Sequence, residues 1–175
     1  TFASGWQLSL GLRLEDVSYD YNNMMIDGRT DEFGVACRFG CRYNRPSDRA
    51  DNFTSLSPKL GLAYPLSDYA NLQVRIQRGF RAPQATELYR LQNNQSVADL
   101  DSVELDSYEI AVNGAGEGWD YSVSLYRMNK DNGIITNSNR ENLNGSDTSH
   151  QGIEVSGGYS LSDTLSIRGV INFAK

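Results

Sequence analysis

The chain has 175 residues and a formal net charge of -6, and 39% of its residues are hydrophobic, with ten tyrosines, six phenylalanines and two tryptophans. This aromatic content argues against disorder, and the lack of any run of lysine or arginine argues against a nucleic-acid partner. No stretch approaches 18 consecutive apolar residues, which excludes a transmembrane helix. A transmembrane barrel is still allowed, because it spreads its apolar surface over alternate positions.

Apolar and polar residues alternate along seven segments of the chain. The clearest segment begins at Trp6 and alternates without a break as far as Glu15. The six later segments are centred on Leu60, Val74, Ile110, Val123, Val155 and Ile167. A repeat of two is typical of a β-strand with one apolar and one polar face. No segment has a sustained helical repeat, apart from a short turn at 85–91. The sequence therefore predicts an all-β, antiparallel fold.

The connections between these segments alternate in length. Short polar stretches at 65–68, 114–118 and 161–164 read as tight turns, whereas the connections at 18–52, 81–106 and 129–149 are long and polar. In an up-and-down sheet this alternation places all long loops at one end, which is typical of a transmembrane β-barrel. A soluble antiparallel β-sandwich or barrel, with its apolar face turned to a core, is the alternative.

Several short motifs follow one another in a fixed order. The sequence SPKLGLAY at 57–64 precedes GFRAP at 79–83 and ELY at 87–89, and SYE at 107–109, YSVSLY at 121–126 and HQGIE at 150–154 follow. This order resembles the barrel region of TonB-dependent outer-membrane receptors over residues 52–175. The motif residues are Gly79, Phe80, Arg81, Ala82, Pro83, Glu87, Leu88, Tyr89, His150, Gly152 and Glu154.

The resemblance implies an antiparallel up-and-down transmembrane β-barrel segment of about seven strands from a barrel of 22. Residues 1–175 are expected to form a partial barrel domain, without the plug domain and the terminal strands of a complete receptor. The resemblance also implies that the protein is located in the bacterial cell outer membrane, where the barrel contacts outer-membrane lipid. The implied function is uptake of a ferric siderophore or a similar scarce nutrient, with energy supplied by TonB, ExbB and ExbD through the plug. The alternative function is a soluble or surface-attached β-rich module that binds carbohydrate or protein.

The long loops hold the candidate ligand-binding residues. These are Arg42 and Tyr43 in the first loop, and Arg81, Tyr89 and Arg90 in the second. The resemblance also implies a disulfide between Cys37 and Cys41, because receptors of this family often have a close cysteine pair in an extracellular loop. Metal binding or a redox role for the two cysteines is the alternative.

Two further expectations concern the end of the third segment. Gly79 lies inside a strand pattern, which suggests a bulge or a close backbone approach. Arg78 and Arg81 are expected to be solvated or to face the barrel interior, where Glu87 or Glu104 would neutralise them.

The sequence contains no recognisable catalytic constellation. His150 is the only histidine, so neither a metal site with several histidines nor more than one imidazole base can be built. The chain is therefore expected to be no enzyme and to need no metal or other cofactor.

Overall fold

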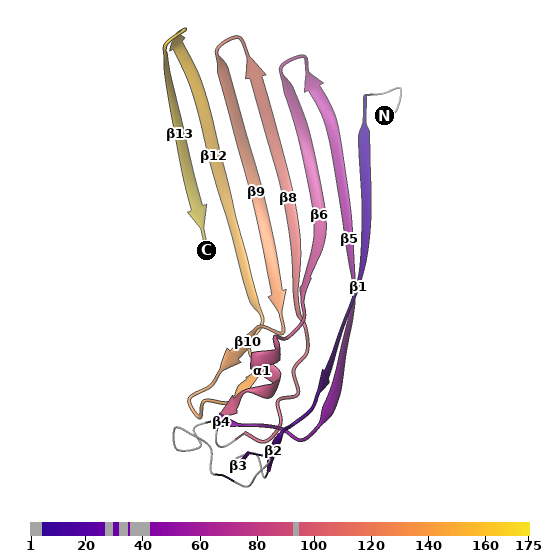
Figure 1. Cartoon of the computed structure of the whole chain (residues 1–175). Helices are drawn as coiled ribbons and strands as arrows, with labels where there is room; N and C mark the ends of the chain where they lie inside the picture. The colour runs from indigo at the N-terminus through magenta and orange to yellow at the C-terminus, as the bar shows by residue number, and fades with distance from the viewer. Residues whose placement is uncertain (1–4, 27–29, 32–34, 36–42, 93–94) are drawn as a thin grey trace.

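A single antiparallel sheet of seven strands dominates the computed structural model, which describes residues 5–26, 30–31, 35, 43–92 and 95–175. In spatial order the strands are β1 (Gln7–Tyr21), β5 (Arg49–Ser67), β6 (Ala70–Arg81), β8 (Val103–Gly116), β9 (Trp119–Asp131), β12 (Thr148–Ser162) and β13 (Leu165–Ala174). Each strand pairs with the next long strand along the chain (Figure 1). The sheet is open, with β1 and β13 at its edges.

Smaller elements lie in the long connections. Strand β2 (Met25–Ile26) pairs with β3 (Thr30–Asp31), β4 (Tyr43–Asn44) with β7 (Leu91–Gln92), and β10 (Ile134–Thr136) with β11 (Asn142–Asn144). The short helix α1 (Ala85–Tyr89) follows β6, where the sequence predicts a turn. Within the described residues, no helix is long and apolar enough to cross a membrane.

The two ends of the sheet have different connections. At one end, the hairpin turns consist of residues 68–69, 117–118 and 163–164, and Gly118 has a φ of +77°, which few other residues adopt without strain. The long connections lie together at the other end, which Figure 1 draws at the bottom. We call this loop end the upper end of the sheet, and the end with the tight turns the lower end. The predicted alternation of short turns and long loops is confirmed.

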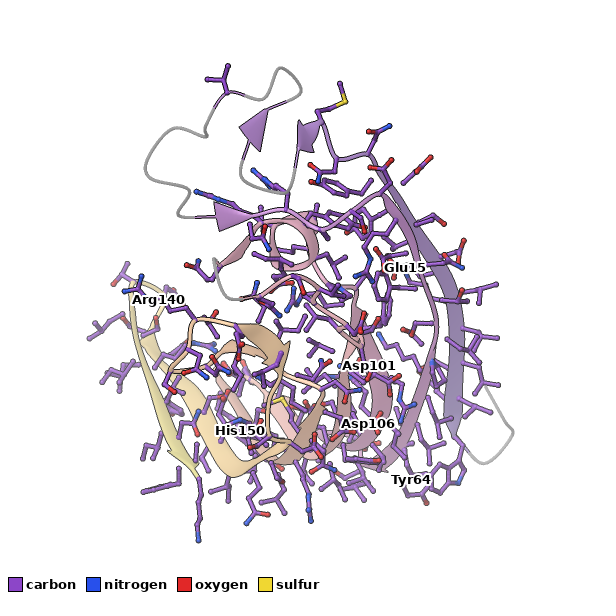
Figure 2. All side chains as sticks on the ribbon, turned by 90° about the horizontal axis from the view of Figure 1, so that it is seen from below. Glu15, Tyr64, Asp101, Asp106, Arg140 and His150 are labelled. Carbon is purple, nitrogen blue, oxygen red and sulfur yellow. The ribbon has the colours of Figure 1, made fainter. Side chains whose placement is uncertain are left out.

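Along most of each strand, the apolar positions lie on the convex face of the curved sheet. Leu10, Leu12 and Leu14 are 76%, 71% and 72% exposed there, although leucine is usually buried in a soluble protein. Figure 2 shows Tyr64 on this convex side and Glu15 on the concave side. A face so apolar and so exposed is suited to contact with lipid.

Toward the loop end of β1 and β5 the two faces exchange character. Above Leu14 the convex positions become polar, and the Ser18 hydroxyl donates a hydrogen bond of 2.9 Å to the Asn52 side chain on β5. The concave positions of β1 become apolar and aromatic, and Tyr19 packs edge-on against Phe53 of β5, beside the Arg49–Asp51 ion pair. The exchange places the upper limit of the apolar band near Leu14.

This exchange explains why the long strands exceed the sequence-based expectation. The β1–β5 pairing continues up to Tyr21 opposite Arg49, so the first loop is 22–48 rather than 18–52. The other two loops are likewise shorter than expected, at 82–102 and 132–147. The strands continue beyond the apolar band because the concave residues at their upper ends pack against the folded loops.

The expected bulge at Gly79 is absent. Pairing of β6 with β8 runs in one register through Gly79 opposite Leu105, and a Cβ at Gly79 would meet Leu105 only at 3.9 Å, an ordinary contact. What changes near this point is the other neighbour, because the pairing of β6 with β5 ends at Gln77 opposite Lys59. The irregular pairings of the large sheet lie beside the tight turns, between Pro65 and Ser67 and between Ser160 and Ser162.

Candidate ligand-facing site in the loop cap

The connections at the loop end fold into a small packed unit on the concave side of the sheet (Figure 2). Its core consists of Leu88, Tyr89, Leu91, Ala98 and Leu100, and Tyr19, Tyr21, Phe53 and Ile134 pack against it. We call residues 82–102 and the hairpin 134–144 the loop cap. Because Leu88 and Leu91 are fully buried, the loop cap is a preformed structure.

Tyr89 is the central side chain of the loop cap. Its ring stacks on Tyr21 with centroids 4.4 Å apart, and its hydroxyl donates a hydrogen bond of 2.8 Å to Asp51 Oδ2. Asp51 also pairs with Arg49, and the Tyr89 carbonyl accepts a hydrogen bond of 3.1 Å from Arg45. Burial, reinforced by the hydrogen bond to Asp51, raises the pKa of Tyr89 well above its usual value. Tyr89 therefore joins α1 to the upper ends of β1 and β5.

Arg81 and Glu87 form a bidentate ion pair between the end of β6 and α1. Arg81 Nη1 donates to Glu87 Oε2 at 3.0 Å and Nη2 donates to Oε1 at 3.3 Å. Glu87 Oε2 also accepts a hydrogen bond of 2.7 Å from the Gln84 backbone N–H, as part of a capping box at the start of α1. The expectation that Glu87 neutralises Arg81 is confirmed. The Arg81 side chain remains 43% exposed, so part of its guanidinium is open to solvent.

Pro83 fixes the path of the chain out of β6. It is buried, and its carbonyl accepts a hydrogen bond of 3.0 Å from the Tyr19 hydroxyl on β1. Since proline has no N–H to donate, it suits the point where a strand leaves its ladder. The GFRAP and ELY motifs thus form one continuous unit, from the end of β6 through α1.

Side-chain amides connect the β10–β11 hairpin to the rest of the loop cap. Gln95 Nε2 donates to the Asn142 carbonyl at 2.7 Å, and the Asn142 N–H donates to Gln95 Oε1 at 2.9 Å. Asn142 Nδ2 also donates to the Glu87 carbonyl at 2.9 Å, and Asn144 exchanges hydrogen bonds with the Asp101 backbone. These residues are not among those predicted from the sequence, where the only signal for them is the high asparagine content of 137–144.

The HQGIE motif forms a different part of the concave face. His150, Gly152 and Glu154 lie on β12 opposite Met128, Tyr126 and Ser124 of β9. A Cβ at Gly152 would lie 2.5 Å from the Tyr126 hydroxyl and 2.5 Å from the Phe173 carbonyl. Glycine is required there because the tyrosine ring covers it. These residues shape the barrel wall and do not belong to the packed core of the loop cap.

The remaining predicted site residues are only partly described. Cys37, Cys41 and Arg42 lie outside the described residues, and of Tyr43 only the backbone is placed, in β4 opposite Gln92. Arg90 is the exposed residue that ends α1. Among the described residues, no group of three or more histidine, cysteine, aspartate or glutamate side chains is arranged to hold a metal ion.

Arg78 is neutralised as expected, but it lies on the convex face. It shares the side of β6 that bears Leu72, Val74 and Ile76, directly opposite Asp106 on β8. Its guanidinium donates two hydrogen bonds of 2.7 Å to Asp106, and Nη1 lies 3.1 Å from Glu104. It is therefore no part of the concave side, where the other candidate residues lie.

A sheet that is apolar on its convex face, polar on its concave face and covered by folded loops at one end has the features of the wall of a transmembrane β-barrel. Residues 1–174 match the family described as "TonB dependent receptor-like, beta-barrel". The chain belongs to this family of TonB-dependent receptors, whose barrels are of the outer-membrane type. TonB-dependent receptors are transporters and not enzymes, in agreement with the sequence-based expectation.

Solved structures of such receptors share the fold. The siderophore receptor PirA from Pseudomonas aeruginosa is 21% identical over 72% of this chain and 26% of its own, with a TM-score of 0.63. The copper transporter OprC is 16% identical over 99% of this chain and 26% of its own, with a TM-score of 0.73. The FrpB iron transporter from Neisseria meningitidis is 13% identical over 98% and 23%, with a TM-score of 0.66.

The chain spans about a quarter of the length of these structures. None of the curated proteins matches it.

Proposed function

We propose that the chain forms part of the barrel wall and loop cap of a receptor that takes up a ferric siderophore or a similar scarce nutrient across the outer membrane. The rest of the barrel and the plug would come from the remainder of the receptor, and TonB with ExbB and ExbD would supply the energy through the plug. Two similar structures are a siderophore receptor and an iron transporter, which favours an iron-containing substrate. A third is a copper transporter, so copper must be included in any test.

The observation that carries this proposal is the preformed loop cap with Arg81 at its edge. Arginine binds carboxylate-like and catecholate-like oxygens through two parallel hydrogen bonds, as it binds Glu87 here. The chelating oxygens of an anionic ferric complex can take the place of Glu87 on the exposed guanidinium. The released Glu87 keeps its hydrogen bond to the Gln84 N–H, so α1 need not unfold.

The other predicted contacts have different parts in the proposal. Tyr89 is only 5% exposed, so it serves by holding the loop cap in place and not by direct contact with the ligand. Arg90 ends α1 with an exposed side chain, and with Arg42 and Tyr43 it is proposed as a further ligand contact. A Cys37–Cys41 disulfide would close a short loop of the same receptor, and mass spectrometry after thiol alkylation would detect it.

A pair of substitutions with opposite expected effects tests the proposal in the complete receptor. Arg81→Ala removes the guanidinium and should weaken binding of an anionic ferric chelate about tenfold, or about 1.4 kcal/mol. Glu87→Gln removes the competing charge but keeps an oxygen for the Gln84 N–H, and should strengthen binding. Equilibrium binding of ferric hydroxamate, ferric catecholate, haem and Cu²⁺ measures both effects and identifies the substrate class.

Arg75→Ala is the matched control. Arg75 also lies on the concave face in an ion pair, with Glu109 at 3.1 Å, but it is six residues from Arg81 along β6, roughly 20 Å in an extended strand. Its removal should leave chelate binding unchanged. Binding of none of the four probes to the wild-type receptor would overturn the proposed substrate class, and equal losses for Arg81→Ala and Arg75→Ala would overturn the role of Arg81.

A further inference from the structure

The sheet contains a break between β5 and β6 toward its upper end. Pairing of these two strands runs from their tight turn to Lys59 opposite Gln77 and goes no further. The next residue of β5 is Pro58, which has no N–H with which to continue the ladder. Above this point β5 stays paired with β1, and β6 stays paired with β8. The two pairs of strands therefore separate toward the loop end (Figure 1).

The break is closed at its upper end by the loop cap. There the Tyr89 hydroxyl, on α1, donates its hydrogen bond to Asp51 on β5. Between this contact and Pro58 both strands are described, and neither strand pairing nor a hydrogen bond joins residues 52–57 of β5 to residues 79–81 of β6. This stretch of β5 is roughly 20 Å long. The wall thus has an opening that is bounded by strand pairing below and by side chains above.

A groove lies on each face of the sheet at the lower end of the break. The convex groove has a volume of about 620 Å³, and apolar side chains such as Leu10, Leu60 and Ile76 line it. The concave groove has a volume of about 430 Å³. Both grooves are lined by Pro58 and Gln77, which are the residues at the end of the pairing. The two grooves therefore adjoin the same gap between the strands.

Two features keep the lower end of the break open. Gly79, which has no side chain, lines the concave groove beside it. The guanidinium of Arg78 is held over β8, away from β5, by its two hydrogen bonds of 2.7 Å to Asp106. Arg81 lies two residues above Gly79 on the same face of β6, roughly 7 Å away. The guanidinium that is proposed to bind the chelate is thus next to the break.

We propose that this break admits the acyl tail of an amphiphilic substrate, whose chelating head binds at Arg81 while its tail passes between β5 and β6 into the convex groove. This inference rests on the proposed function, and it narrows the substrate class to metal chelates that carry an acyl chain. Such a molecule partitions into the membrane, because burial of its methylene groups is favourable. Entry through the mouth of the barrel would draw the tail into the polar interior, whereas the break leaves it among apolar side chains and lipid.

The test compares probes that differ only in their tail. Ferric hydroxamate and ferric catecholate probes are each made with a dodecanoyl tail and with an acetyl group in its place. Radioiron bound to the complete receptor in lipid nanodiscs is measured at equilibrium, and binding to protein-free nanodiscs is subtracted. With the head group that it accepts, the wild type should bind the dodecanoyl probe about tenfold more tightly than the acetyl probe.

Gly79→Trp should abolish this preference, because the indole fills the concave end of the break. A Cβ at this position makes only an ordinary contact of 3.9 Å with Leu105, so the backbone can accept the change. Ser124→Trp is the control, since it places the same bulk on the concave face of β9, two strands away from β6. It should keep the preference of the wild type. The ratio of the two affinities is compared within each protein, so a change in head-group binding alone does not alter the readout.

Three results would overturn the proposal. Equal binding of the acetyl and dodecanoyl probes by the wild type, a measurement that needs no variant, would exclude a site for the tail. An unchanged preference in Gly79→Trp, or an equal loss in Ser124→Trp, would exclude the break as its path. In each of these cases the acetyl probe still binds, so the proposed function stands. Binding of no probe by the wild type would instead overturn the proposed chelate site and this inference with it.

Discussion

Apolar and polar residues alternate along both the lower and the upper part of the β1–β5 pair, but the face that is apolar differs between the two parts. In the lower part the convex residues Leu10 and Leu12 are apolar and exposed, and the concave residues are polar. In the upper part the concave residues Tyr19 and Phe53 are apolar and packed against the loop cap, and the convex residues are polar. One backbone ladder passes through both parts without a shift in register.

The difference shows that a repeat of two indicates a β-strand, but does not tell which surroundings the strand has. The surroundings of each face are indicated by whether the apolar residues lie on that face. Lipid on the convex side requires apolar residues there, and water on the same side requires polar ones. Above the membrane, the strands need a core of their own, and the loops provide it on the concave side. The exchange near Leu14 is therefore a sequence marker of the membrane surface.

The largest expected effect separates the two kinds of apolar surface. Leu88→Ala leaves a cavity in the core of the loop cap and should reduce the free energy of opening of the cap by about 2–5 kcal/mol. Leu12→Ala, the same change on the lipid-facing side, leaves no enclosed cavity because lipid chains fill the space, and should cost less. Hydrogen exchange of the α1 amides in the complete receptor measures the first effect, and urea titration in vesicles the second. Similar costs at both positions would contradict the assignment of the convex face to lipid.

The second prediction tests where the membrane ends. Leu10→Arg places a charge in the apolar band and should destabilise the receptor in vesicles by about 2–4 kcal/mol, as charges do near the middle of a bilayer. Ser18→Arg, on the same face of the same strand but above the exchange, should change the unfolding free energy by no more than about 0.5 kcal/mol. If Ser18→Arg lowered the unfolding free energy by several kcal/mol, the membrane surface would lie above Ser18, and the distinction between the lower and upper parts would be wrong.

The lower part of the sheet, and the start of the loop cap, follow from the sequence alone. The seven strands, the three tight turns and the position of α1 all come from local signals, which are the repeat of two, turn residues and the loss of alternation. The pairing of Arg81 with Glu87 is also predictable, because the two residues are close in sequence and opposite in charge.

The upper part was harder to predict for a physical reason. The exchange of faces interrupts the apolar alternation, so 18–21 and 49–52 were expected to be loop, although their strand pairing continues. The Gln95–Asn142 bridge joins residues 47 apart, and a contact of this kind leaves no periodic signal in the chain. The placement of Arg78 on the convex face was missed because charge alone suggested the barrel interior.

The third prediction concerns the side chain of Asn142, which joins the β10–β11 hairpin to α1. Asn142→Ala removes the amide that donates to the Glu87 carbonyl, and leaves this acceptor in a part-buried place without its partner. We expect a cost of about 1–3 kcal/mol, limited to the loop cap. Limited proteolysis of the complete receptor should show faster cleavage within 82–102 and an unchanged β-barrel band on a gel. Thr136→Ala is the control, because its exposed hydroxyl bonds only to the Asn142 side chain at 3.1 Å within the same hairpin.

The smallest expected effect is a dependence on pH that belongs to the upper part alone. Burial and the hydrogen bond to Asp51 hold the Tyr89 phenol in its protonated form, so its pKa is higher in the folded cap than in the unfolded one. The stabilisation is fully present below the unfolded value of about 10, and it is lost as the pH rises above that value, because the unfolded cap releases its proton first. Tyr89→Phe should cost about 1 kcal/mol at neutral pH, through the lost hydrogen bond, and should flatten the profile above pH 10. Tyr21, whose pKa is also raised by burial, leaves a residual slope in that variant.

The lower part of the barrel, followed by urea titration over the same pH range, should show no change on Tyr89→Phe. If the stability of the lower part did change, the loop cap and the membrane-spanning wall would unfold as one cooperative unit. The exchange of faces would then mark a change of surroundings only, and would not separate two regions of different stability.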